Sequence, residues 1–151
     1  MKLRTVSLAL LLLLSITAVA ADSDRKHIVL RKSAPANTLP FSEGVLVGNT
    51  LYLGGHIGLD PKTGKPGATP EDEARLVMDG IKQTVETAGM TMDDLVSVQV
   101  FCSDVANYDA FNAVYRTYFH GEYPARAFLG SGKLLFGARY EVMGIAVKGT
   151  K

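Results

Sequence analysis

The chain has 151 residues, of which 16 are Lys or Arg and 15 are Asp or Glu, for a formal net charge of +1 at pH 7. This length fits one domain with one hydrophobic core, and the near-neutral charge does not provide the basic face that nucleic-acid binding usually requires. The single cysteine, Cys102, excludes an intrachain disulfide. Because Cys102 lies in an apolar run, we interpret it as a small buried hydrophobe, with a reactive thiol as the alternative.

The N-terminus has the pattern of a secretory signal peptide. Lys2 and Arg4 form a positive start, an apolar run follows over residues 6–16, and Ala18-Val19-Ala20 supplies small residues at the expected cleavage site. A membrane anchor is the alternative, but a spanning helix needs about 20 apolar residues and this run is shorter. We therefore expect an exported protein, periplasmic if bacterial and otherwise secreted, that leaves the membrane after cleavage. The predicted organisation is a signal peptide (1–20), a polar leader (21–26) and a single domain (27–151).

Three strands are predicted before the first helix, over residues 27–31, 45–47 and 51–53. The last two flank Gly48-Asn49-Thr50, a short glycine-containing turn that is typical of a β-hairpin. Gly54 and Gly55 are expected to end the second arm of the hairpin, where side chains would obstruct a close approach of backbone. Residues 60–70 are rich in Pro, Gly and Thr and predict a loop.

A helix is predicted to begin at Pro70. Thr69 is expected to cap it, and the acidic residues 71–73 place negative charge in its first turn. Apolar residues recur at helical spacing and predict one buried stripe, and Gly89 is expected to stop the helix. The stripe consists of Ala74, Val77, Met78, Ile81, Val85 and Ala88.

The second half of the chain predicts a strand, a helix and two more strands. Residues 95–102 form the strand, with Val96, Val98, Val100 and Cys102 expected on one side. The helix is expected to open near Asn107 or Asp109 and to reach about Phe119, and the last strands cover 125–130 and 140–148. Two amphipathic helices and a mostly antiparallel sheet of six strands predict a two-layer α+β domain with both helices on one face.

Arg126 is the strongest candidate for a functional residue. It follows Tyr123-Pro124-Ala125 and shares a strand face with Phe128. A guanidinium beside apolar neighbours needs an anionic partner, and its planar fork matches a carboxylate in a bidentate way. A surface arginine or a structural ion pair is the competing interpretation.

Other polar residues have weaker signals. Glu141 lies in an otherwise apolar strand, where an acid either pairs with a base such as Arg126 or serves proton transfer. Asn112 lies among aromatic residues of the second helix and is a candidate to contact substrate, although a polar residue on a helix edge is the commoner explanation. His56 follows Gly55 and is interpreted first as a surface or structural residue, with a side chain that points into a cleft as the alternative. The three histidines are scattered without metal-ligand spacing, so no metal site is expected.

Several short motifs, taken together, resemble the Rid/YjgF family, whose members are also labelled reactive intermediate deaminases or L-PSP endoribonucleases. The match runs from about residue 27 to residue 148. It rests on Ser33-Ala34-Pro35-Ala36, Gly48-Asn49, Leu53-Gly54-Gly55-His56-Ile57, Phe111-Asn112-Ala113-Val114-Tyr115, Pro124-Ala125-Arg126, Tyr140-Glu141-Val142 and Ile145-Ala146-Val147.

The resemblance implies a chorismate-mutase-like subunit that forms a homotrimer with clefts between subunits. It implies hydrolysis of reactive 2-imino or enamine acids to 2-keto acids and ammonia, without cofactor or metal. By this resemblance Arg126 binds the substrate carboxylate, Glu141 positions or activates water, and Gly55 and Asn112 line the pocket. A non-catalytic carboxylate-binding or regulatory protein is the main alternative, and an endoribonuclease is a further one that the charge balance disfavours.

The chain also departs from the family's pattern. Phe41 stands where well-known members often have tyrosine, Phe128 where they often have cysteine, and Gly54 where they have serine. Phe41 and Phe128 are therefore expected to make the substrate pocket more apolar, which favours a bulkier or aromatic substrate.

Overall fold

A computed structural model describes residues 25–30 and 39–149. The predicted signal peptide, Arg31 and the segment 33–36 lie outside the described residues. The strands are β1 (Arg25–Ile28), β2 (Gly44–Val47), β3 (Thr50–Ile57), β4 (Leu95–Cys102), β5 (Ala125–Gly130) and β6 (Tyr140–Val147). The helices are α1 (Pro70–Thr87) and α2 (Tyr108–Tyr115), with short 3-10 turns that include η3 (Val105–Asn107), η4 (Arg116–Tyr118) and η5 (Leu135–Gly137).

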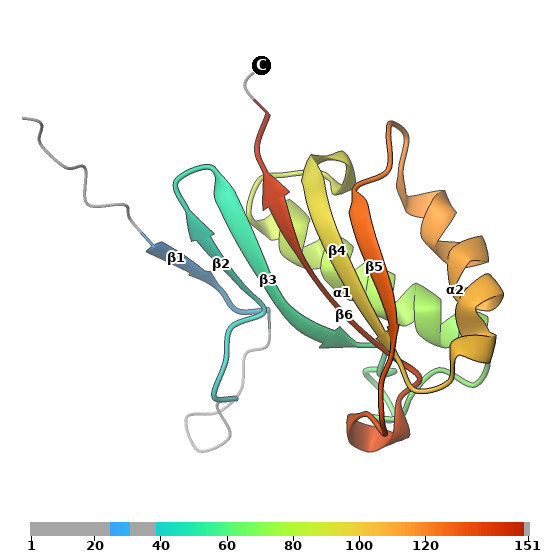
Figure 1. Ribbon diagram of the computed structural model, residues 1–151. Helices are drawn as coiled ribbons and strands as arrows, with labels where there is room; N and C mark the ends of the chain where they lie inside the picture. The colour runs from blue at the N-terminus through green and yellow to red at the C-terminus, as the bar shows by residue number, and fades with distance from the viewer. Residues whose placement is uncertain (1–24, 31–38, 150–151) are drawn as a thin grey trace, which may run out of the picture.

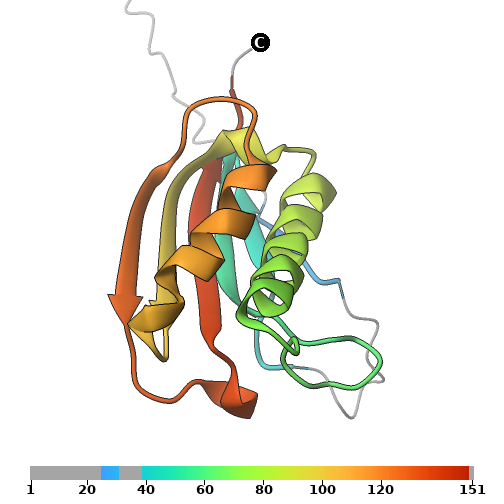
Figure 2. The same ribbon diagram turned by 90° about the vertical axis from the view of Figure 1, so that its right-hand side faces the viewer.

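The six strands form one open sheet in the order β1-β2-β3-β6-β4-β5 (Figure 1). Only β4 and β5 pair in parallel, and the other neighbours are antiparallel. Both helices pack on the same face of the sheet (Figure 2), which leaves the opposite face uncovered by either helix. The predicted two-layer α+β architecture is therefore confirmed. No helix in the described part of the chain is long and apolar enough to cross a membrane.

Helix α1 follows its sequence signals. The Thr69 hydroxyl accepts a hydrogen bond from the amide of Asp72 at 3.1 Å, which caps the first turn. At the other end Gly89 has a φ of +76°, the left-handed conformation that terminates a helix and that suits glycine. The predicted stripe faces the sheet, with Ala74, Val77, Met78, Ile81 and Val85 buried and Ala88 partly buried against the core.

The predicted end of the second hairpin strand was wrong. β3 does not stop at the glycine pair but continues to Ile57, with a register shift against β6 between Leu53 and His56. The amide of Gly54 donates to the carbonyl of Glu43 at 3.0 Å, and a Cβ at Gly54 would lie 2.9 Å from the Ser42 carbonyl oxygen. The glycines thus permit the close backbone approach, as expected, but within a bulged strand.

The strand boundaries and faces needed two further corrections. β1 begins at Arg25, two residues before the predicted start, because Arg25 and Lys26 pair with Val47 and Leu46 of β2. In β4 a register shift between Leu95 and Ser97 leaves Val96 47% exposed, so its predicted place beside Val98, Val100 and Cys102 was wrong. Leu95 is buried instead.

Cys102 is buried at the end of β4, as predicted. Its thiol donates to the carbonyl oxygen of Asp104 at 3.0 Å. Burial raises the pKa of the Cys102 thiol, and the hydrogen bond to Asp104 offsets this only in part. The residue therefore behaves as a small core side chain and not as a reactive thiol.

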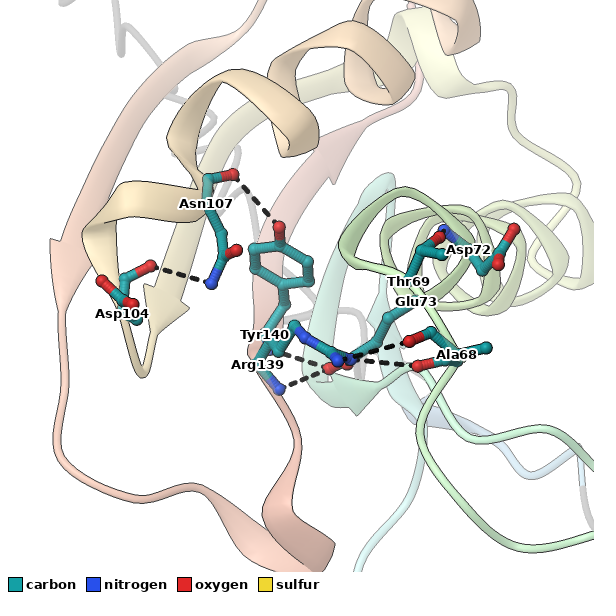
Figure 3. Close-up of polar contacts among 9 residues, drawn as sticks. Ala68, Thr69, Asp72, Glu73, Asp104, Asn107, Arg139 and Tyr140 are labelled. Atoms are coloured by element: carbon teal, nitrogen blue, oxygen red, sulfur yellow. Dashed lines mark hydrogen bonds and ion pairs between the residues drawn. The ribbon is translucent and has the colours of Figure 1, made fainter.

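A buried ion pair connects α1 to the start of β6 (Figure 3). Glu73 is fully buried, and its carboxylate accepts hydrogen bonds from the Arg139 guanidinium at 2.7 Å and from the amides of Arg139 and Tyr140 at 2.5 and 3.0 Å. The guanidinium also donates to the carbonyl of Gly67 at 3.0 Å. The sequence predicted Glu73 only as an N-terminal helix acid, whereas it fixes the backbone that leads into β6.

Candidate functional site

Arg126 lies half-buried on the side of β5 that faces the helices. Its guanidinium carbon is 4.5 Å from the ring centroid of Tyr115 on α2, and 5.9 Å from those of Tyr108 and Phe128. Strand alternation produces this orientation, because Arg126 pairs with the buried Val98 of β4 and paired residues share a face. Cation–π contacts of this kind hold the guanidinium plane beside the rings.

A cavity of about 340 Å³ opens beside this guanidinium. It is lined by Tyr108, Asn112, Tyr115, Arg116, Tyr123, Pro124 and Arg126. None of these residues is acidic, and within the described ranges no carboxylate forms an ion pair with Arg126. In the single chain, Arg126 is therefore neither a fully exposed surface arginine nor half of an internal salt bridge.

Two further polar groups of the cavity are buried, the Asn112 amide and the Tyr115 hydroxyl. Asn112 is 4% exposed and makes no side-chain hydrogen bond to the described residues, and the Tyr115 hydroxyl interacts only with Arg126 among them. Burial raises the pKa of Tyr115 to about 12, against a smaller opposing effect of the Arg126 charge. The phenol is therefore protonated at neutral pH and can donate a hydrogen bond. The cavity thus combines two guanidinium groups, those of Arg126 and Arg116, with the buried side chains of Asn112 and Tyr115.

Glu141 lies in a different part of the fold from Arg126. It pairs with Ile57 of β3 and Phe101 of β4, and its carboxylate lies so close to Gly55 that any Cβ at position 55 would collide with it. Gly55 also lines a cavity of about 530 Å³, together with Phe41, which is 52% exposed. Gly55 therefore contacts Glu141 and also lines this cavity with Phe41, whereas Glu141 is not among the residues that line it.

Arg126 and Glu141 are separated by the sheet. Arg126 shares the helix-facing side of the sheet with Val98, whereas Glu141 shares the uncovered side with Phe101. Val98 and Phe101 are three residues apart on β4, so they point to opposite faces. Within one chain the structure brings Arg126 and Asn112 together and does not bring Glu141, Gly55 or Phe41 to them.

Phe128 does not line the cavity beside Arg126. Its ring contacts those of Tyr108 and Phe111 at centroid distances of 4.9 and 5.6 Å, and lies beside the guanidinium. Phe41 and Phe128, which were expected to make one substrate pocket more apolar, do not line a common cavity within a single chain. Phe128 instead supports the position of Arg126.

Sequence reasoning missed Tyr108, Arg116 and Tyr123 as cavity residues. Tyr108, Asn112 and Arg116 are spaced four residues apart, which places them along one side of α2 and its 3-10 extension. That spacing was visible in the sequence. The spacing does not show that β5 lies beside this side of the helix.

His56 is a structural residue, as first interpreted. Its Nδ1 lies 2.8 Å from the carbonyl oxygen of Gly54 and its Nε2 lies 2.9 Å from the Thr84 hydroxyl of α1. The ring is only 9% exposed. Across the described residues, no group of three or more His, Cys, Asp or Glu side chains is arranged to hold a metal ion.

Comparisons with known proteins agree with this fold. Residues 31–148 match the family model described as Endoribonuclease L-PSP. The chain is 36% identical over 126 residues to 2-iminobutanoate/2-iminopropanoate deaminase of Capra hircus, covering 82% of this chain and 91% of that protein. It is also 36% identical over 124 residues to a RutC family protein of Saccharolobus solfataricus, covering 82% and 98%.

Solved structures show the same likeness. The YjgF gene product from E. coli matches with a TM-score of 0.74 and 33% identity, over 82% of this chain and 99% of that one. E. coli TdcF with bound serine matches with a TM-score of 0.73 and 30% identity, over 82% and 100%. Both the sequence and the backbone of the domain are therefore similar to those of these proteins.

Proposed function

This chain belongs to the Endoribonuclease L-PSP family, also called Rid/YjgF, and from that premise we propose that it hydrolyses reactive 2-imino acids to 2-keto acids and ammonia. The observation that carries the proposal is Arg126, whose guanidinium borders a cavity without any acidic lining residue. A half-buried guanidinium without a carboxylate partner favours binding of an anion. Relatives named 2-iminobutanoate/2-iminopropanoate deaminase agree with a small carboxylate as that anion.

The proposed reaction needs no redox step. A water oxygen bonds to the imine carbon while the π bond to nitrogen opens and the nitrogen takes one water proton. The remaining hydroxyl proton then moves to nitrogen, the carbon–nitrogen bond breaks, and ammonia leaves as the carbonyl forms. Arg126 holds the carboxylate of the substrate, and Glu141 takes each of the two water protons in turn and passes it to the nitrogen. Orientation of substrate and water supplies much of the acceleration, because imines already hydrolyse in water.

The same proposal requires a second copy of the chain. Since Arg126 and Glu141 face opposite sides of one sheet, the complete site is assembled when Gly55 and Glu141 of one subunit meet Arg126 and Asn112 of its neighbour. The uncovered face of the sheet supports assembly because it carries large apolar side chains: Tyr52, Leu129 and Met143 are 51%, 44% and 38% exposed. We propose a homotrimer with three such clefts, in line with the family resemblance.

We also propose that the mature protein works outside the cytosol. The support is the order of positive residues, apolar run and small residues over residues 1–20. The mass of the protein recovered from its native host tests this point. A chain that begins near residue 21 or 22 agrees with export, and an intact N-terminus contradicts it.

Rapid mixing tests the activity. An amino-acid oxidase generates 2-iminobutanoate in the presence of the wild-type protein, of Arg126→Gln, or of the surface control Lys82→Gln. We expect wild-type and Lys82→Gln to accelerate 2-oxobutanoate formation over buffer, and Arg126→Gln to lower kcat/KM by about 100-fold or more.

Other outcomes separate the alternatives. No acceleration by the wild-type protein, together with Arg126-dependent binding of 2-oxobutanoate, identifies a non-catalytic carboxylate binder. Degradation of RNA by a clean preparation, lost in Arg126→Gln, identifies a nuclease.

A further inference from the structure

The cavity beside Arg126 carries a second guanidinium, that of Arg116. Arg116 begins η4 directly after α2 and lies four residues beyond Asn112 on the same side of the helix. Among the described residues neither arginine has a carboxylate within 4.0 Å, and no acid lines the cavity. Two positive charges around one cavity favour a ligand with two negative charges.

The two arginines differ in their surroundings. Arg126 is half-buried against the ring of Tyr115, whereas Arg116 is exposed. A carboxylate at Arg126 is therefore held at the inner end of the cavity, where the Tyr115 hydroxyl and the Asn112 amide are also available. A second carboxylate on the same molecule would extend from this end toward Arg116 at the rim.

We propose that the preferred substrates are 2-imino dicarboxylates, such as the imines of aspartate and glutamate. This inference rests on the proposed function: Arg126 binds the carboxylate next to the imine, and Arg116 binds the carboxylate of the side chain. The reaction is the same hydrolysis, in which water adds to the imine carbon and ammonia leaves, and it yields a 2-oxo dicarboxylate. Arg116 is a specificity-determining residue in this scheme.

Two other roles for the cavity make different predictions. The tyrosine rings would suit an aromatic substrate, in which case the imine of phenylalanine is the best substrate. Alternatively, Arg116 pairs with Glu141 of the neighbouring subunit, in which case its removal slows the hydrolysis of every imine alike. Comparison of three substrates separates these roles from the proposed one.

The experiment compares the imines of aspartate, 2-aminobutyrate and phenylalanine, each generated in place by an oxidase, with wild-type protein, Arg116→Gln and Lys82→Gln. We expect the imine of aspartate to have the highest kcat/KM in the wild-type protein. Arg116→Gln should lower that value by about 10- to 100-fold and lower the value for 2-iminobutanoate by a clearly smaller factor. Lys82→Gln, which removes an exposed charge on α1, should change neither.

The results distinguish this inference from the proposed function. Hydrolysis of 2-iminobutanoate without preference for the dicarboxylate, or an equal loss on all substrates in Arg116→Gln, overturns the inference and leaves the deaminase proposal standing. If no imine is hydrolysed, calorimetry measures the affinities for 2-oxoglutarate and 2-oxobutanoate and so tests whether the cavity prefers a dicarboxylate. Tighter binding of 2-oxoglutarate that depends on Arg116 supports a dicarboxylate site, and equal affinities overturn it.

Discussion

Arg126 and Glu141 lie on opposite faces of one sheet, with β4 between their strands. In a single chain, a carboxylate bound to Arg126 is therefore out of reach of Glu141. The proposed chemistry becomes possible only where the uncovered face or edge of one subunit meets the helix side of another. Substitutions that dissociate the oligomer are therefore expected to reduce imine hydrolysis to the same extent.

A charge on the uncovered face of the sheet tests this dependence. Met143 of β6 is 38% exposed and pairs with Gln99 of β4. Met143→Glu should place an unpaired carboxylate in the interface and weaken assembly by about 2 kcal/mol or more. We expect sedimentation to show smaller species and imine hydrolysis to fall in parallel, whereas Lys82→Glu on the outer side of α1 leaves both unchanged. Full activity in a dissociated Met143→Glu protein would contradict the shared site.

Gly55 is expected to be essential for the position of Glu141. A Cβ at residue 55 would collide with the Glu141 carboxylate, so Gly55→Ala should turn this side chain away. We expect kcat/KM for 2-iminobutanoate to fall by about tenfold or more, with a loss of unfolding free energy of only about 1–3 kcal/mol. Gly132→Ala is the matched control, because a Cβ there meets nothing within 4 Å. Unchanged kinetics in Gly55→Ala would remove Glu141 from the proposed mechanism.

The buried carboxylate of Glu73 should contribute strongly to stability. It accepts hydrogen bonds from the Arg139 guanidinium and from the amides of Arg139 and Tyr140. Glu73→Ala leaves these donors without their acceptor and is expected to lower the free energy of unfolding by about 3–5 kcal/mol. Glu71→Ala, which removes an exposed acid from the same first turn, should cost less than about 1 kcal/mol. Urea unfolding measures both, and similar small losses would contradict the assigned role of Glu73.

Stability should decrease at alkaline pH because of buried tyrosines. Burial raises the pKa of Tyr115 from 10.0 to about 12 and raises those of Tyr118 and Tyr140 as well. Above pH 10.0 the unfolded chain loses phenol protons that the folded protein retains, so this contribution is complete below pH 10.0 and is lost as the pH rises toward about 12. Melting temperatures should therefore fall over this range, and less steeply in Tyr115→Phe. An identical slope in the variant would show that Tyr115 does not contribute.

Regular elements were predictable because their signals are local. Thr69, Pro70 and Gly89 determine the ends of α1 through contacts within a few residues, and the apolar period determines its buried face. The bulges were not predictable, since the extra residue near Gly54 and Val96 changes the pairing with β6 without changing the composition of either strand. Period-two alternation therefore assigned Val96 to the wrong face.

The candidate site was predictable only in pieces. Arg126 and Asn112 were selected by residue type and resemblance, and the structure places both at one cavity. Arg116 and Tyr123 were missed because their relevance depends on α2 and β5 lying side by side, a relationship between segments and not a property of either. The separation of Arg126 from Glu141 depends in the same way on which face of the sheet the helices cover.

The strand that comes last in the sequence, β6, lies in the middle of the sheet between β3 and β4. Until β6 has been synthesised, the earlier strands remain as separate pieces with unpaired edges, and the core under α1 lacks Tyr140, Val142 and Ala146. The complete sheet and core can therefore form only after β6 is available. We therefore expect the nascent chain to lack its central strand until β6 has been synthesised, a state that is compatible with the export proposed above.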